Sequence, residues 1–162
     1  WSSDVCSSDL TVFDLRRRQV ETPSLRIGRE LAEFEAALGF RPIAVVDESV
    51  DDLCVDQDPH REIADHVLLA LREALSNTMR HAHATRVWVE VRATNGRVGF
   101  VVTDDGVGIA PNSRLGDGLT NLCQRAESLG GDCSIEPRAG GGTTVSWSVP
   151  ITSVATASLD VA

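Results

Sequence analysis

Lysine is absent from this sequence, and all 15 of its basic residues are arginines. A Walker A phosphate loop needs Gly-Lys-Ser/Thr, an ordinary protein kinase needs its strand lysine, and Schiff-base chemistry needs a free amine. The missing ammonium group excludes these enzyme classes. A small anionic ligand stays compatible with the sequence if a metal ion and backbone dipoles neutralise it locally.

Cysteine pairs, long apolar runs and positive charge are scarce as well. The cysteines Cys6, Cys54, Cys123 and Cys133 include no Cys-x-x-Cys pair, so neither a zinc site nor a redox motif is indicated, and a reducing cytoplasm is the expected location. No apolar run approaches the roughly 18 residues of a membrane span, and the N-terminus has no basic stretch followed by an apolar one. The net charge of −9 argues against nucleic acid and anionic membranes as partners. We expect a soluble domain, whose parent protein could still be membrane-anchored.

The length of 162 residues suits one compact domain. Residues 1–10 contain a near-repeat, WSSDVCSSDL, and are expected to be an artefactual or disordered N-terminus. Residues 151–162 are small and aperiodic, which predicts a disordered tail. The domain is therefore expected to span residues 11–150.

Periodicity predicts a helix over residues 25–38, a short strand over 43–46, and a long helix that starts near Asp58 and Pro59 and runs to about Ala84. The apolar stripe of the long helix comprises Ala64, Leu68, Leu71, Leu75, Met79 and Ala82. Alternating valines predict a hairpin of strands 86–93 and 98–102 around Asn95-Gly96. A helix over 119–129 and strands over 133–136 and 143–149 follow. This order predicts an α+β fold, a two-layer sandwich with helices on one face of a mixed, mostly antiparallel sheet.

A polar ridge runs beside the apolar stripe of the long helix. Glu73, Asn77 and His81 recur every four residues, so one surface strip carries a carboxylate, an amide and an imidazole. An amide oxygen can bind magnesium, which keeps most of its waters and bridges to substrate phosphates. Taken alone, the ridge is better interpreted as a solvated helix face.

Three glycine-bearing segments follow the ridge in the chain. The sequence DDGVGI at 104–109 ends a strand, where Asp104 could accept a hydrogen bond from an exocyclic amine such as that of adenine. GDGL at 116–119 precedes a helix, and a helix start presents free N–H groups to phosphate. GGGTT at 140–144 places a threonine hydroxyl near Asp104. Each segment singly could be an ordinary turn, but the shared order of all of them indicates a nucleotide site.

This ordered set resembles the Bergerat ATP-binding fold of histidine kinases, gyrase B, heat-shock chaperone ATPases and mismatch-repair ATPases. The sensor-kinase branch is the best match, on REALSNTMRHA at 72–82, DDGVGI at 104–109, GDGL at 116–119 and GT at 142–143. The short stretch between Ile109 and Gly116 is similar to the abbreviated lid of nitrate-sensor-like and dormancy-sensor-like kinases. The resemblance covers roughly residues 11–150.

The resemblance implies that ATP and Mg²⁺ are the ligands. Asn77 would hold the metal. Glu73 would order the metal's water shell, whereas the residue at this position in the ATPase relatives activates water. His81 would lie near the phosphates, with Arg80 or Arg114 as further sources of positive charge. The remaining implied nucleotide-binding positions are Asp104 and Thr143 on the adenine side, Gly106, Gly108 and Ile109 in the first glycine segment, and Gly116, Gly118 and Leu119 at the lid and helix start.

The implied reaction is histidine kinase chemistry, in which the γ-phosphoryl of ATP passes to a histidine of a dimerisation domain and then to the receiver domain of a response regulator. RELAE at 29–33 has alanine where the phosphoacceptor box needs histidine. The stretch TVFDLR at 11–16 resembles the junction that follows the dimerisation hairpin. The fragment is therefore expected to bind ATP without phosphorylating itself. The alternatives are an anti-sigma-factor-type serine kinase, a nucleotide-binding module without transferase activity, and a stand-alone ATPase.

Overall fold

The computed structural model describes residues 21–54, 58–109 and 116–151. The expected artefactual N-terminus, the TVFDLR stretch, the short lid with Arg114 and the expected tail from residue 152 onward lie outside the described residues. The side chains of Asp58 and Pro59, at the predicted helix start, do so too.

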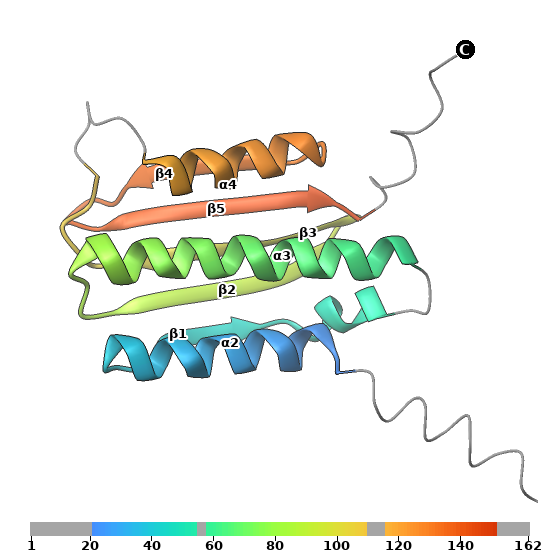
Figure 1. The fold of residues 1–162 in the computed structure, drawn as a ribbon, viewed down its shortest axis with the longest axis horizontal. Helices are drawn as coiled ribbons and strands as arrows, with labels where there is room; N and C mark the ends of the chain where they lie inside the picture. Colours follow the sequence, from blue (N-terminus) through green and yellow to red (C-terminus); the bar gives the residue numbers. More distant parts are fainter. Residues whose placement is uncertain (1–20, 55–57, 110–115, 152–162) are drawn as a thin grey trace, which may run out of the picture.

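The described chain builds a five-stranded sheet in the order β1-β2-β3-β5-β4 (Figure 1). The strands are β1 (Ile43–Val46), β2 (Val87–Thr94), β3 (Arg97–Asp104), β4 (Asp132–Pro137) and β5 (Thr143–Pro150). Strand β1 pairs with β2 in parallel, and all other neighbours are antiparallel. The predicted hairpin is confirmed, because Asn95 and Gly96 both have positive φ, as a tight two-residue turn between β2 and β3 needs.

The helices lie on one face of this sheet, so the predicted two-layer sandwich is confirmed (Figure 1). They are α2 (Pro23–Leu38), α3 (Asp58–Asn77) and α4 (Asp117–Ser128), with a 3₁₀ helix η1 (Glu48–Cys54) and a π-helix η2 (Thr78–Ala82). Helix α2 starts with Thr22 as its N-cap and Pro23 in its first turn, and it ends at Gly39 in the left-handed conformation. No helix in the described part of the chain is both long and apolar enough to cross a membrane.

The core fills the space between the helices and the sheet. Inward-facing valines of β2 and β3 meet an apolar stripe of α3, all at most 2% exposed: Val87, Val89, Val91, Val98, Val102, Ile63, Val67, Leu71 and Leu75. On β5, Trp147 stacks on Phe100 of β3 at 5.6 Å between ring centroids. The Trp147 indole N–H also donates to the backbone oxygen of Leu122 on α4 at 3.1 Å. The central strands therefore fix where α3 and α4 lie.

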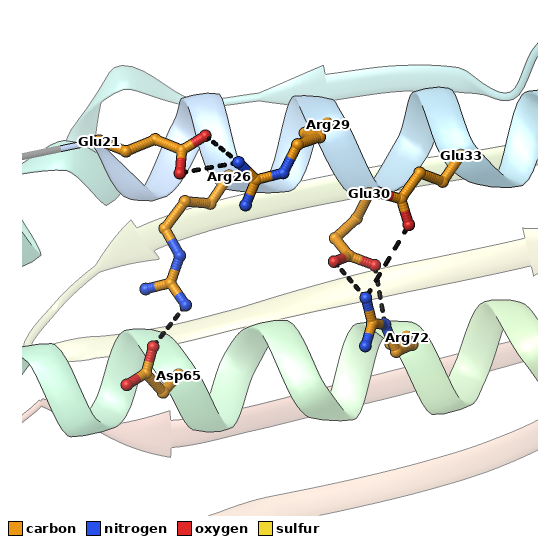
Figure 2. Close-up of polar contacts among 7 residues, drawn as sticks. All are labelled: Glu21, Arg26, Arg29, Glu30, Glu33, Asp65 and Arg72. Atoms are coloured by element: carbon orange, nitrogen blue, oxygen red, sulfur yellow. Dashed lines mark hydrogen bonds and ion pairs between the residues drawn. The ribbon is translucent and has the colours of Figure 1, made fainter.

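Charged side chains join α2 to α3 (Figure 2). Glu30 is 5% exposed and accepts two hydrogen bonds from the Arg72 guanidinium, at 2.6 and 2.8 Å. A second ion pair links Arg26 to Asp65 at 2.6 Å. Because a buried carboxylate is unfavourable unless it is paired and hydrogen-bonded, Glu30 needs Arg72 as its partner, and the pair helps to hold α2 on α3.

Two features differ from the sequence predictions. The long helix changes to a π-helix after Asn77, and Met79, predicted to lie in the apolar stripe, is 39% exposed, because the extra residue per π-turn changes which side chains face the core. Cys123 and Cys133 form a disulfide, which the spacing of the cysteines in the sequence did not indicate. The chain between them reverses direction and places β4 beside α4, and the two cysteines have Cα atoms 5.0 Å apart.

Candidate functional site

A hollow of about 470 Å³ opens where η2, the end of β3, the start of α4 and the start of β5 meet. All the predicted site residues except Gly106 line it: Glu73, Asn77, His81, Asp104, Gly108, Ile109, Gly116, Gly118, Leu119 and Thr143. Segments separated by tens of residues in the chain thus contribute to one concave site, which is the usual form of a small-molecule site.

The Glu73 and Asn77 side chains form one unit on α3. The Asn77 amide nitrogen donates to the backbone oxygen of Glu73 at 2.8 Å and to its carboxylate Oε1 at 3.1 Å. Because the nitrogen is used in this way, the amide oxygen Oδ1 is the atom left to accept a bond or to coordinate a cation. The amide group lies against the start of α4, since a Cβ at Gly118 would lie 3.2 Å from both its oxygen and its nitrogen.

The π-helix η2 carries Arg80 and His81 to the rim of the hollow. Such single π-turns inside helices occur often at functional sites. Thr78, 7% exposed, donates from its hydroxyl to the Ala74 oxygen at 3.3 Å, and it also lines the hollow. The turn ends at His83, which has φ of 49°. The π-helix therefore gives Arg80 and His81 positions that a regular helix would not.

Asp104 ends β3 and is 4% exposed. Its carboxylate accepts the Gly106 backbone N–H at 2.9 Å. Burial raises the pKa of Asp104, while hydrogen bonds from the backbone of Gly106 and Thr143 act in the opposite direction. A buried acceptor at the edge of a hollow suits recognition of an amino group on a flat ring.

Gly106 lies behind the hollow rather than in its lining. A Cβ at this position would overlap the backbone oxygen of Ala82, and Val107 donates its N–H to that same oxygen at 2.8 Å. Gly106 is not among the residues that line this hollow, and its expected role of letting the nucleotide lie close stays a prediction. The close packing of β3's end against η2 requires a glycine here.

The start of α4 forms another part of the lining of the hollow. Gly116 is its N-cap and provides no side-chain hydrogen bond, so the first-turn N–H groups have no capping side chain there. Gly118 lies against the Glu73 carboxylate, which a Cβ would overlap. The helix start and the Glu73–Asn77 unit are thus immediate neighbours, as an anionic group shared between N–H donors and a cation would require.

Sequence reasoning missed Thr78 and Asp117 as lining residues. It also missed Asp105, which does not line the hollow but bonds to the chain beside it. Thr78 follows the recognised Asn77 directly, but no spacing rule singles it out, because the switch to a π-turn has no reliable sequence signal. Asp105 could have been noticed as a second acid directly after Asp104.

The hollow of this α/β sandwich combines an amide-bearing helix, a buried aspartate and an uncapped helix start. This combination is that of a nucleotide-binding domain. Residues 62–153 match the family model described as histidine kinase-, DNA gyrase B-, and HSP90-like ATPase. The chain belongs to this family, and it is an ATP-binding domain of the sensor histidine kinase type.

Curated relatives agree. The nitrate/nitrite sensor protein NarX of Escherichia coli K12 is 36% identical over 140 residues, 84% of this chain and 22% of the relative. The nitrate/nitrite sensor protein NarQ of the same strain is 34% identical over 144 residues, 86% of this chain and 24% of the relative. The chain thus spans about a quarter or less of the length of these relatives.

Solved structures share the fold. The histidine kinase domain of the blue-light activated kinase from Erythrobacter litoralis EL346 has a TM-score of 0.63 at 22% identity, covering 80% of this chain and 61% of that one. The ATP-binding domain of PrrB from Mycobacterium tuberculosis has a TM-score of 0.53 at 20% identity, covering 77% of this chain and 90% of that one.

Proposed function

We propose that this domain binds ATP with Mg²⁺ and transfers the γ-phosphoryl group to a histidine of a dimerisation domain, from which it passes to the receiver domain of a response regulator. The observation that carries this proposal is the single hollow that brings Asn77, Asp104 and the start of α4 together. The sensor-protein relatives support it, because they match the chain over most of its length.

The chain's own residues have distinct parts in this proposal. Asp104 accepts a hydrogen bond from the adenine amino group, and the Thr143 region holds that carboxylate in place. Backbone N–H groups at the start of α4 bind phosphate oxygens, and Arg80 and His81 approach the phosphates from η2. Positioning and charge stabilisation of this kind account for most of the catalysis in phosphoryl transfer.

The donor set near Asn77 fits magnesium rather than a metal held by the protein alone. Within the described ranges, no group of three or more His, Cys, Asp or Glu side chains could hold a metal ion. Magnesium commonly uses one or two protein oxygens, several waters and the substrate phosphates. Asn77 Oδ1 would be the direct ligand, and Glu73 would orient that amide and bond a metal-bound water. When bound, the ion would neutralise the charge on the phosphate oxygens.

Two measurements test the proposal. Isothermal titration calorimetry with a nonhydrolysable ATP analogue and Mg²⁺ should give binding to the wild type that Asp104→Ala abolishes. No heat at millimolar ligand, or unchanged binding by Asp104→Ala, would refute the ATP site.

Phosphotransfer is tested separately by mixing the domain with a dimerisation hairpin that carries a phosphoacceptor histidine. Labelled ATP should then give an acid-labile phosphoryl group on the hairpin. Binding without transfer would favour a nucleotide-binding module, whereas an acid-stable phosphoserine on an added antagonist protein would favour the anti-sigma-type kinase.

A further inference from the structure

Asp105 follows Asp104, yet its carboxylate contacts the chain that leaves η2 instead of lining the hollow. Oδ1 accepts the backbone N–H groups of Thr85 and Arg86, each at 2.7 Å. Oδ2 accepts the Thr85 hydroxyl at 2.8 Å. One side chain thus binds three donors from two consecutive residues, and these donors belong to the segment that joins η2 to β2.

Backbone contacts extend this junction on both sides. Asp105 donates its own N–H to the Arg86 oxygen at 3.2 Å, and Val107 donates to the Ala82 oxygen at 2.8 Å. Between them, His83 is held at φ of 49°, a conformation that is unfavourable for a residue with a Cβ. Segment 82–86 is therefore held in a conformation that it would not adopt alone, and Asp105 supplies the side-chain part of that constraint.

The junction connects two parts of the lining of the hollow. On one side, the π-helix η2 carries Arg80 and His81, and it ends at Ala82, immediately before the segment that Asp105 binds. On the other side, Asp104 directly precedes Asp105 in the chain. A change in the Asp105 contacts is thus passed to both sides through one or a few backbone residues.

We infer that Asp105 is a positioning residue for nucleotide binding, which holds the π-helix η2 against the end of β3 so that Arg80 and His81 keep their placement relative to Asp104. This inference rests on the proposed ATP site. Asp105 is not expected to touch the nucleotide, because it does not line the hollow.

The electrostatics of Asp105 agree with such a constraint. Hydrogen bonds from the backbone of Arg86 and from the side chain and backbone of Thr85 lower the pKa of this carboxyl. The ionised form is therefore the one that the structure stabilises, and it accepts all three hydrogen bonds.

The test uses the full chain and calorimetric titration with Mg²⁺ and a nonhydrolysable ATP analogue, at a temperature where every variant is folded by circular dichroism. Asp105→Ala should weaken binding about tenfold or more, because both parts of the lining lose their common constraint. Asp105→Asn should stay within about threefold of wild type, since an amide oxygen can accept both N–H groups and the amide nitrogen can donate to Thr85 Oγ1. Thr85→Val should have a smaller effect than Asp105→Ala and add little to it in the double variant.

Asp47→Ala is the matched control. Asp47 also accepts a backbone N–H, that of Ser49 at 2.9 Å, and bonding to Ser49 lowers its pKa, but it follows β1 and does not line the hollow. This variant should bind the nucleotide like the wild type.

The outcomes separate the two proposals. Wild type that does not bind the analogue refutes the ATP site itself. If the wild type binds the analogue, two results would overturn the inference and leave the ATP site standing. One is that Asp105→Ala binds as well as wild type, and the other is that Asp105→Asn binds as weakly as Asp105→Ala.

Discussion

Substituting Gly118 by alanine should weaken nucleotide binding and leave the stability of the fold nearly unchanged. An added Cβ would overlap Glu73 Oε1 and lie 3.2 Å from both Asn77 side-chain atoms Nδ2 and Oδ1. The Glu73 carboxylate is the end of a flexible, half-buried side chain, so it can move away. It would then lose its 3.1 Å hydrogen bond from Asn77.

The expected magnitudes nearly cancel for folding. Alanine is favoured over glycine in a helix by about 1 kcal/mol. Loss of one hydrogen bond costs about 1 kcal/mol. The melting temperature should therefore change by no more than about 4 °C. Nucleotide binding has no such compensation, because Asn77 loses the partner that orients its amide. We expect Mg²⁺-dependent affinity to fall by about tenfold, which corresponds to about 1.4 kcal/mol.

The assay is calorimetric titration of an ATP analogue with Mg²⁺ and with excess chelator, alongside thermal unfolding. The loss should be larger with Mg²⁺ than without it. Gly28→Ala is the control, because Gly28 lies exposed within α2 and no atom lies within 4 Å of a Cβ built there. It should raise the melting temperature by about 2–4 °C and leave affinity unchanged. A folded Gly118→Ala variant whose Mg²⁺-dependent affinity stays within twofold of wild type would refute the assignment of Glu73 as the residue that orients Asn77.

Three further changes test other parts of the structure. Asp104→Asn should abolish adenine binding. It should also raise stability at neutral pH, because burial raises the pKa of Asp104 and the fold therefore disfavours the ionised carboxylate. This gain in stability over wild type should shrink as the pH falls through the raised pKa, because the wild-type carboxyl is then protonated. Gly106→Ala should destabilise strongly, by several kcal/mol, because its Cβ meets the rigid backbone oxygen of Ala82. Glu30→Ala should cost about 2 kcal/mol, seen as a lower urea midpoint, because it removes two charged hydrogen bonds from Arg72.

Each of these expectations has a contrary result. Two results would contradict the assignment of Asp104 as a buried, unfavourably ionised carboxylate in the adenine site. One is that Asp104→Asn keeps its nucleotide affinity, and the other is that its stability difference from wild type grows toward acid pH. Wild-type melting of Gly106→Ala would contradict the close contact with η2. An unchanged urea midpoint for Glu30→Ala would show that the α2–α3 ion pair contributes nothing to stability.

Local patterns in the sequence were enough to predict the three α-helices and the five strands that the structure describes, and most of the residues that line the hollow. The alternation of Val87, Val89 and Val91, the Asn95-Gly96 turn and the glycines around α4 each express a preference of a few neighbouring residues, which holds in almost any tertiary setting. The same holds for Glu73, Asn77 and His81, because a spacing of four places side chains on one helix face. The absence of lysine also excluded whole classes of enzyme without any structure.

Tertiary structure alone decided what depends on contacts between distant segments. The π-turn that exposes Met79, the meeting of Cys123 with Cys133, and the three hydrogen bonds of Asp105 all arise where segments pack against one another. Gly106 shows the difference most clearly. Its motif marked it as part of the nucleotide site, but the backbone oxygen of Ala82 is what excludes a side chain there. Such packing is a property of pairs of segments, and no window of neighbouring residues encodes it.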